Sequence, residues 1–334
     1  MTLPKTQQVV YLDGTSEGYD TIKPVFDFPV PTIDGPTEMI IKNRYAGVNY
    51  IESYFRKGIY PIEKFPYVMG REALGEVVAV GKDVTKYKVG DFVAYVNPNT
   101  FAQFNKITED KVQVYKLKDG SHLKEYGAAI MQSLTALTFI TEAYNVKKDD
   151  IVLVWAAAGG VGKILVQLIK SRGAKVIALA SSKEKQKEVL ALGADYVINS
   201  KDSDITEQVL KITNGEGVHA SFDSVGKTSF ETSLKSLRRK GTFVSFGNSS
   251  GPVEPFPVTI LSPKNIKFVR PQVFAYISTD EEWNFYASQV AELLDNKKLV
   301  IDIYKVYPLE KYAEAAADLE SRKTSGKLLL DIPQ

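Results

Sequence analysis

Cysteine is absent from this chain of 334 residues, and histidine occurs only twice. Without cysteine there can be no disulfide, no thiolate nucleophile and no cysteine-bound metal. The two histidines, His122 and His219, lie too far apart to show the spacing of metal ligands. The sequence therefore predicts no catalytic metal, and any redox chemistry would need a bound organic cofactor.

A strong charge of one sign is also missing. Lys and Arg number 42 against 40 Asp and Glu, which leaves a net charge of +2. Nucleic-acid-binding domains are usually far more basic, so this balance argues against nucleic acid as the main partner. No apolar run is long enough to span a membrane, and Met1–Asp20 shows neither a signal-peptide core nor an arginine-rich transit pattern. We expect a cytoplasmic protein with no membrane contact, and a nuclear fraction stays open.

The central part of the chain alternates apolar, β-branched runs with helical patterns. This alternation predicts a doubly wound parallel sheet of the Rossmann type. The predicted strands are Ile151–Ala156, Val176–Ala180, Tyr196–Ile198, Ala220–Ser224, Thr242–Phe246 and Ile266–Val269. The preceding part is richer in Gly, Pro and Tyr, and its alternating stretches, such as Glu76–Val80 and Asp91–Val96, are typical of a β-rich domain.

The C-terminal part predicts two amphipathic helices, Asp280–Asp295 and Leu309–Arg322, and a closing strand, Lys327–Ile332. A chain of this length can bury two hydrophobic cores. We expect a β-rich domain over residues 1–127, a dinucleotide-binding domain over 128–270 and a C-terminal part, 271–334, that completes the first domain. The α/β domain is thus inserted into a domain built from both chain ends.

Small residues follow the first strand of the predicted sheet. Residues 156–162, with the sequence AAAGGVG, come directly after this strand and open a helical pattern at Ile164–Ile169. Small side chains let backbone amides at a helix start approach a pyrophosphate. The spacing A-x-x-G-x-x-G departs from G-x-G-x-x-G, and small residues also permit tight strand–helix packing without a ligand. The position at the start of a βαβ unit favours dinucleotide binding, with contacts at Ala158, Gly159, Gly160, Val161 and Gly162.

The end of the second strand indicates which dinucleotide binds. Selectivity for NAD usually requires an acidic residue there, to hold the ribose 2′-hydroxyl. This chain has Ser181 and Ser182, followed by Lys183 and Lys185. Hydroxyl and ammonium groups suit a 2′-phosphate, which a carboxylate would repel. Ser182 could equally cap the next helix, and capping is compatible with phosphate binding, so the charges favour NADPH over NADH.

One segment resembles the signature of the medium-chain dehydrogenase/reductases. It is GREALGEV, residues 70–77, followed by Gly81. In the zinc alcohol dehydrogenases of that superfamily, a histidine that helps hold the catalytic zinc stands at the position of Arg71. With arginine there and no cysteine in the chain, the sequence resembles the zinc-free branch. The resemblance implies a GroES-like fold for the β-rich catalytic domain.

Within that branch, the chain resembles the zeta-crystallin-like NADPH:quinone oxidoreductases. The segments that carry this resemblance, in the order of that family, are Ala46–Tyr54 with Gly58–Tyr60, Phe222–Gly226, Val244–Gly251, and Glu320–Arg322 with Gly326 and Lys327. The resemblance implies that Asn49, Tyr54 and Tyr60 line the nicotinamide and quinone cleft as the catalytic residues. The further cofactor contacts that it implies are Asn49, Thr135, Ser181, Lys185, Ser200, Phe246, Gly247, Asn248, Arg322 and Lys327.

Two positions depart from that family. Some relatives have a tyrosine near the adenine where this chain has Ser200, so an aromatic contact there is absent. Lys163 stands where an apolar residue is usual. Its ammonium could add to the positive potential at the helix start, or it could simply lie in solvent.

The resemblance implies zinc-independent reduction of quinones by NADPH, with ortho-quinones as the expected substrates. An aromatic-lined cleft can orient the acceptor against the nicotinamide, and little acid–base machinery is needed. Hydrogen bonds to the quinone would come from Asn49, Tyr54 and Tyr60, although in a chain with 18 tyrosines each could be an ordinary residue at the edge of the core. Transfer of a hydride, or of single electrons by way of a semiquinone, stays open.

Other functions stay open at this point. The same cleft could reduce activated C=C bonds in alkenals or enones. Relatives bind AU-rich RNA, but the near-neutral charge predicts at most weak binding, and a crystallin-like structural role would leave the intact glycines unexplained.

The apolar segment Ile266–Phe274 at the far edge of the sheet, together with the resemblance, predicts a homodimer.

Overall fold

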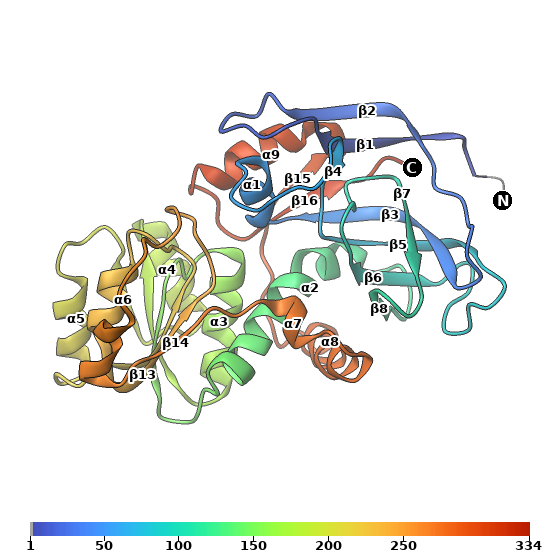
Figure 1. Ribbon diagram of the computed structural model, residues 1–334. Helices are drawn as coiled ribbons and strands as arrows, with labels where there is room; N and C mark the ends of the chain where they lie inside the picture. The colour runs from blue at the N-terminus through green and yellow to red at the C-terminus, as the bar shows by residue number, and fades with distance from the viewer. Residues whose placement is uncertain (1–2) are drawn as a thin grey trace. The chain divides into compact units, whose positions relative to one another are not determined.

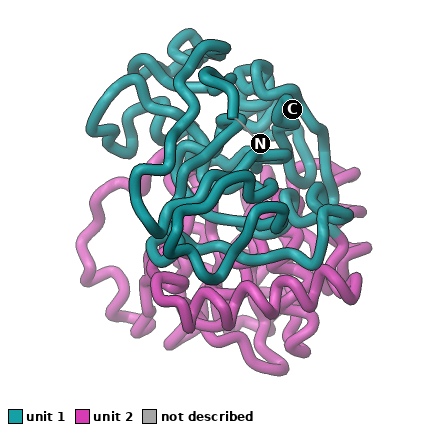
Figure 2. The backbone as a smooth tube through the Cα atoms, turned by 90° about the vertical axis from the view of Figure 1, so that its right-hand side faces the viewer, with its two compact units in different colours: residues 1–131, 301–334 teal, residues 132–300 magenta. Residues whose placement is uncertain are grey.

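The computed structural model describes residues 3–334, which form two compact units (Figure 1). Unit 1 comprises the described residues up to Met131 together with Ile301–Gln334, and unit 2 comprises Gln132–Val300, as Figure 2 shows in teal and magenta. The predicted arrangement, an α/β domain inserted into a β-rich domain made from both chain ends, is confirmed. Within residues 3–334, no helix is both long and apolar enough to cross a membrane.

The second boundary between the units differs from the predicted one. Residues 271–300, which we expected in the β-rich domain, belong to unit 2. They stay there because α8 (Asp280–Asp295) buries one face and its Tyr286 hydroxyl donates a hydrogen bond to Glu142 of the same unit. Farther along, the Val300 amide donates to Gln167 Oε1 at 2.7 Å. The chain returns to unit 1 only at Ile301.

Unit 1 is built on two sheets. Its strands are β1 (Thr6–Leu12), β2 (Ile22–Pro29), β3 (Glu38–Val48), β4 (Tyr67–Val68), β5 (Glu72–Val80), β6 (Phe92–Val96), β7 (Phe104–Thr108), β8 (Gln113–Lys116), β15 (Ile303–Pro308) and β16 (Lys327–Asp331). The larger sheet has the order β15-β16-β3-β5-β6-β8, with β7 also pairing with β3, and the smaller sheet has the order β2-β1-β4. The C-terminal strand β16 thus lies beside β3, with Leu329 opposite Gly47.

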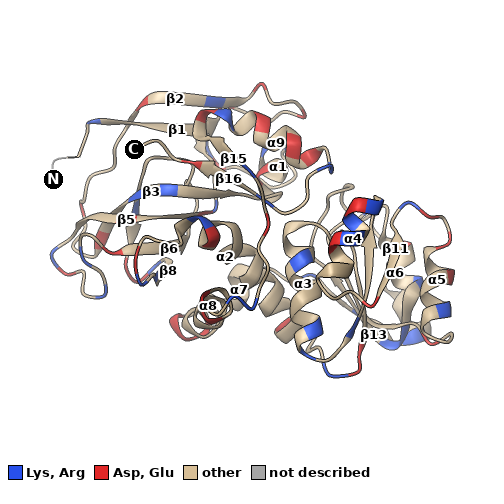
Figure 3. Cartoon of the chain, turned by 180° about the vertical axis from the view of Figure 1, so that it is seen from behind, with Lys and Arg blue, Asp and Glu red and all other residues tan. Residues whose placement is uncertain are grey.

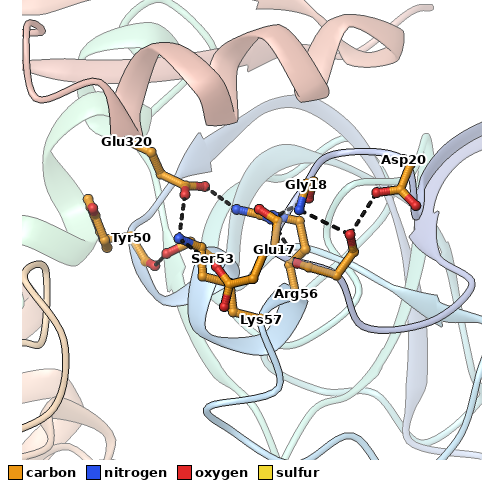
Figure 4. A network of polar contacts seen from close by, with 9 residues as sticks. Glu17, Gly18, Asp20, Tyr50, Ser53, Arg56, Lys57 and Glu320 are labelled. Atoms are coloured by element: carbon orange, nitrogen blue, oxygen red, sulfur yellow. Dashed lines mark hydrogen bonds and ion pairs between the residues drawn. The ribbon is translucent and has the colours of Figure 1, made fainter.

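Two short helical segments of unit 1 are tied together by a buried arginine. They are α1 (Ile51–Arg56) and α9 (Tyr312–Glu320), the second preceded by the 3-10 turn η3 (Leu309–Lys311). Arg56 Nη2 donates to Glu320 Oε1 at 2.5 Å, and its Nη1 donates to the carbonyls of Ser16 at 2.9 Å and Glu17 at 2.7 Å (Figure 4). Lys57 Nζ lies 3.1 Å from the other Glu320 oxygen. Arg56 therefore joins α1, the loop after β1 and the C-terminal end of α9.

Unit 2 contains one six-stranded parallel sheet. The order is β11-β10-β9-β12-β13-β14, and the strands are β9 (Ile151–Val154), β10 (Lys175–Ala180), β11 (Tyr196–Asn199), β12 (Val218–Asp223), β13 (Leu237–Ser245) and β14 (Lys267–Val269). All six strands were predicted, with ends that shift by up to five residues. The helical segments are α3 (Gly160–Ser171), α4 (Lys183–Ala191), α5 (Ile205–Ile212), α6 (Phe230–Ser236), α7 (Val273–Tyr276), α8, the π-helix η1 (Phe139–Ala143) and the 3-10 helix η2 (Val258–Lys264). The remaining helix, α2 (Leu123–Thr138), contains the boundary between the units.

The order of the strands locates the ligand edge of this sheet. From β9 the chain runs outward through β10 to β11, then returns to the other side of β9 for β12, β13 and β14. In open α/β sheets, ligands bind at the carboxyl ends of the strands where the order reverses. Here that point lies between β9 and β12. A dinucleotide site is therefore expected at the loops after β9, β12 and β13.

Candidate functional site

The loop after β9 makes a turn that only small residues permit. Ala156 has φ of 48°, a conformation that few residues other than glycine adopt. A Cβ atom at Gly162 would lie 2.3 Å from the Ala156 carbonyl oxygen, so any other residue there would force the loop away from α3. The helix begins at Gly160 with no side-chain cap. Its first amides are therefore available to an anion, as a pyrophosphate site requires.

A buried aspartate shapes the neighbouring loop after β12. Asp223 accepts hydrogen bonds from the Val225 amide at 2.8 Å, the Gly226 amide at 3.1 Å, Ser229 Oγ at 2.8 Å and Ser233 Oγ at 2.7 Å. Burial raises the pKa of this carboxyl, while the four donors oppose the rise. Because its oxygens are used inside the loop, we interpret Asp223 as a residue that holds the backbone in place.

The loop after β13 brings three of the predicted contact residues together. The Phe246 amide donates to Asp223 O at 2.8 Å, which ties this loop to the end of β12. A Cβ at Gly247 would lie 2.4 Å from the Ser224 carbonyl oxygen, so the two loops touch only because Gly247 has no side chain. The Asn248 amide nitrogen donates to Gly247 O at 2.8 Å. Phe246, Gly247 and Asn248 thus lie at the expected end of the sheet.

Arg270 is a residue of this region that the sequence did not point to. Its guanidinium donates to the carbonyls of Ser245 and Gly247, each at 3.2 Å, and to Asn248 Oδ1 at 3.1 Å. It thereby braces the loop after β13 from the residue that follows β14. The only signal in the sequence was an arginine directly after a predicted edge strand. No motif around this arginine indicates which residues it would contact.

The remaining predicted contacts of unit 2 lie on three other elements. Ser181 follows β10 and is half-buried, and Ser182 is the N-cap of α4, with its Oγ accepting from the Lys185 amide at 3.3 Å. Burial lowers the pKa of Lys185, Glu188 opposes the shift and Lys163 adds to it. Ser200 follows β11, and its amide donates to the Ala180 carbonyl at 3.2 Å. Thr135 lies on α2, in the part of that helix that belongs to unit 2.

In unit 1, the predicted residues Asn49 and Lys327 meet at a buried carboxylate. Lys327 Nζ lies 2.8 Å from Glu72 Oε1 and 2.8 Å from Asn49 Oδ1, and Asn49 Nδ2 donates to Glu72 Oε1 at 2.8 Å. Lys327 is 4% exposed and Glu72 is fully buried. Burial lowers the pKa of Lys327, and the Glu72 carboxylate opposes that shift. The three side chains form a polar cluster, and the orientation of the Asn49 amide follows from it.

Backbone geometry explains why this cluster fits. A Cβ at Gly47 would lie only 2.1 Å from Glu72 Oε1, so the carboxylate occupies the space that a side chain would take. The Met131 amide donates to the second Glu72 oxygen at 3.2 Å. Asn49 Nδ2 also donates to the Gly47 carbonyl at 3.2 Å. Gly47 is therefore required by the site itself and not by a turn.

A second buried carboxyl, Glu52, lies close to this cluster. It is fully buried, one oxygen accepts from the Gly70 amide at 3.3 Å, and the other has no hydrogen-bond partner among the described residues. Burial raises its pKa to about 7, although the Arg71 guanidinium lowers it. Glu52 is thus a carboxyl that exchanges its proton near neutral pH.

Tyr54 and Tyr60 lie together in an aromatic group at α1. Their ring centroids are 5.3 Å apart in an edge-to-face arrangement, and the Tyr60 amide donates to the Tyr54 carbonyl at 3.2 Å. Phe55 lies 5.7 Å from Tyr60 and 5.6 Å from Tyr67. Tyr54 is only 7% exposed, so its ring belongs largely to the packing of unit 1. Tyr60 is half-buried.

Arg322 lies in the turn after α9. It is exposed and has φ of 58°, and its amide donates to the Leu319 carbonyl at 3.3 Å. The neighbouring Glu320 is held by Arg56 (Figure 4). Through this ion pair, the turn that carries Arg322 and the helix that carries Tyr54 share one buried anchor.

Comparisons with known proteins agree with this architecture. Residues 35–161 match the family described as "Alcohol dehydrogenase GroES-like domain", and residues 160–292 match "Zinc-binding dehydrogenase". The fold and loops therefore define a dehydrogenase of the medium-chain dehydrogenase/reductase superfamily. A "Probable quinone oxidoreductase" from Schizosaccharomyces pombe is 44% identical over 298 residues, which cover 88% of this chain and 89% of that one.

Two further relatives extend the comparison. The structure of an Escherichia coli quinone oxidoreductase complexed with NADPH has a TM-score of 0.91 and 33% identity, covering 98% of this chain and all of that one. A "2-haloacrylate reductase" from Burkholderia sp is 31% identical over 90% of this chain and 92% of that one. The chain belongs to the quinone oxidoreductase family.

The residues at the position of a catalytic zinc do not fit that ion. The Arg71 guanidinium donates to the Tyr67 hydroxyl at 2.6 Å and lies 4.3 Å above the Phe55 ring. The adjacent carboxylate, Glu72, is paired with the Lys327 ammonium. A positive group therefore stands at the histidine position, where zinc would need a neutral or anionic donor, and the carboxylate next to it in the chain is already paired. Among residues 3–334, no group of three or more His, Asp or Glu side chains is placed to hold a metal.

The buried ion pair has a measurable consequence for stability. Lys327→Met should lower the free energy of unfolding by about 3–5 kcal/mol, because it leaves the Glu72 carboxylate buried without its ammonium. The double variant Glu72→Gln with Lys327→Met should recover part of this loss, since neither charge remains. Calorimetry measures the effect, and Lys82→Met, at an exposed lysine of unit 1, is the control. Equal stability of Lys327→Met and Lys82→Met would contradict the assignment.

Proposed function

We propose that this protein is a zinc-independent NADPH:quinone oxidoreductase. The observation that carries the proposal is the loop at residues 156–162, at the reversal point of the parallel sheet, with Ser181 and Lys185 in place of a carboxylate after β10. The high identity to quinone oxidoreductases supports the substrate class, and the NADPH complex of the similar Escherichia coli enzyme supports the cofactor. Arg71 and the absence of cysteine support zinc independence.

The residues of unit 2 fit such a cofactor. The amides at the start of α3 suit the pyrophosphate, and Lys185 with Ser181 suits the 2′-phosphate. The full set of proposed contacts is Asn49, Thr135, Ala158, Gly159, Gly160, Val161, Gly162, Ser181, Lys185, Ser200, Phe246, Gly247, Asn248 and Arg322. Lys327, which the resemblance placed in this set, uses its ammonium on Glu72 and Asn49 and is proposed instead as a positioning residue.

Bound NADPH would supply the electrons for reduction, and the protein's own residues would orient the acceptor. Lys327 and Glu72 hold the Asn49 amide in one orientation, with its oxygen toward the ammonium and its nitrogen toward the carboxylate. The proposed role of Tyr54 and Tyr60 is to donate hydrogen bonds to quinone oxygens, which gain negative charge as they are reduced. This chemistry requires no metal.

The decisive measurement is oxidation of NADPH in the presence of a panel of ortho-quinones, para-quinones and 2-alkenals. We expect turnover with quinones that survives exhaustive chelation, and much tighter binding of NADPH than of NADH.

Lys185→Ala should weaken NADPH binding by about 1.5–3 kcal/mol, the range for a hydrogen bond to a charged group, and leave NADH binding nearly unchanged. Lys187→Ala, at an exposed lysine of the same helix, is the control. Equal wild-type affinities for the two nucleotides, or loss of activity on removal of stoichiometric zinc, would refute the proposal.

A second candidate activity is reduction of activated C=C bonds. The observation that favours it is the similarity to the Burkholderia 2-haloacrylate reductase over 90% of this chain. Both reactions would need the same cofactor loops and the same orientation of an electron-poor acceptor beside Tyr54 and Tyr60. A higher kcat/KM for 2-alkenals or 2-haloacrylates than for every quinone in the panel would make this the main activity.

The tyrosine hydroxyls provide a test of where the chemistry occurs. Tyr54→Phe and Tyr60→Phe should each lower kcat/KM for quinones by about ten- to a hundredfold, because an oriented hydrogen bond is lost at about 1.4 kcal/mol per decade. The melting temperature and NADPH affinity should change little. Tyr304→Phe, at a tyrosine that is 46% exposed, serves as the control. Normal kinetics in both variants, or a loss of stability without a kinetic change, would mean that these rings only pack.

The proposed assembly is a homodimer formed through the outer edge of the parallel sheet. β14 is the terminal strand of that sheet, and Val258 in the preceding η2 is 74% exposed. An apolar edge strand left open would be an aggregation hazard. Light scattering at micromolar concentration should therefore give a mass of about twice that of the chain, and a monomeric mass would contradict the proposal.

A further inference from the structure

Lys163 is buried in the first turn of α3, close to the start of the glycine-rich segment. The residue is 4% exposed, and lysine is almost never buried without a charged partner. Its Nζ lies 2.9 Å from Glu188 Oε2 on α4. The pair therefore links the helix that follows β9 to the helix that follows β10. Lys163 stands where the related sequences usually have an apolar residue. Its burial shows that the interpretation of Lys163 as a solvent-exposed residue was wrong.

The Lys163 to Glu188 pair is part of a group of three charges. Lys185 is three residues before Glu188 on α4, and both Glu188 and Lys163 act electrostatically on Lys185. Other charges of the helix, on Lys183, Glu184 and Lys187, belong to exposed residues, and Figure 3 shows blue and red residues side by side along α4. Two ammonium groups against one carboxylate give this group a net charge of +1. Without Lys163, Glu188 would reduce that charge to zero.

We propose that Lys163 is a specificity-determining residue for the 2′-phosphate of NADPH, because its ammonium balances Glu188 and leaves the positive charge of Lys185 to act on the phosphate. The inference rests on the proposed function, in which Lys185 meets this phosphate. NADH has the same pyrophosphate and adenosine but no 2′-phosphate. An effect of Lys163 on the pyrophosphate alone would change both affinities equally, so the ratio of the two affinities isolates the proposed role.

If the ion pair between Lys163 and Glu188 has only a structural role, different results are expected. If Lys163 only connects α3 to α4, its loss should lower stability and disturb both nucleotides alike. If charge is what matters, NADPH affinity depends on the net charge of Lys163, Lys185 and Glu188, and substitutions can make that net charge either lower or higher. Lys163→Met removes one positive charge, Glu188→Gln removes the negative charge, and the double variant has the same net charge as the wild type.

The experiment measures the Kd of NADPH and of NADH by isothermal titration calorimetry for the wild type and these three variants, with a melting temperature for each. Lys187→Met is the matched control, because it removes a positive charge from the exposed side of the same helix. Lys163→Met should weaken NADPH binding by about three- to tenfold, with less than a twofold change for NADH. Glu188→Gln should tighten NADPH binding, and the double variant should return to within about twofold of the wild type.

Three results would overturn the inference. An unchanged ratio of NADPH to NADH affinity in Lys163→Met would show that the charge does not reach the phosphate. If that variant does not fold, Glu188→Gln still decides, because unchanged or weaker NADPH binding there would contradict the charge sum. A wild-type protein that binds both nucleotides equally would instead overturn the proposed cofactor preference, and the inference with it.

Discussion

The ion pair between Lys327 and Glu72 is the interaction on which unit 1 depends most. It joins residues 255 positions apart in the chain, the first on the last strand and the second on β5. A buried charge that loses its partner costs several kcal/mol, so neither side chain can occupy its place without the other. Pairing of β16 with β3 brings Lys327 to Glu72, and Gly47 makes the room for the carboxylate. The orientation of Asn49 is a consequence of this pair.

Unit 2 depends on a different constraint, which is the close approach of backbone segments at the carboxyl ends of its parallel strands. This close approach occurs in two loops: Ala156, with its unusual backbone conformation, and Gly162 lie in the loop after β9, and Gly247 lies in the loop after β13. Hydrogen bonds to Asp223 fix the loop after β12, and hydrogen bonds from Arg270 fix the loop after β13. These residues act on loop geometry, so their effect on a ligand is indirect.

Local patterns predicted a large part of the fold. Helix α8 was predicted at Asp280–Asp295, as observed, because apolar residues recur along one face. In the structure Thr279 and Glu282 also form a capping box at its start. The strands of the parallel sheet were found from β-branched runs. Residues 271–300 were assigned to the wrong side of the boundary, because their membership depends on contacts of Tyr286 and Val300 with distant residues. A local pattern contains no information of that kind.

The sequence by itself determined the class of fold and the glycine-rich loop, and it carried the predictions of a phosphorylated dinucleotide and of a site without zinc. Each of these depends on residue types at short spacing or on residues that are missing. Only the tertiary structure decided that Lys327 pairs with Glu72, that Arg270 braces the loop after β13, and that Lys163 is buried against Glu188. The partner of a buried charge is determined by how distant segments pack against each other. The free energy of burying that charge therefore cannot be read from the residues next to it in the sequence.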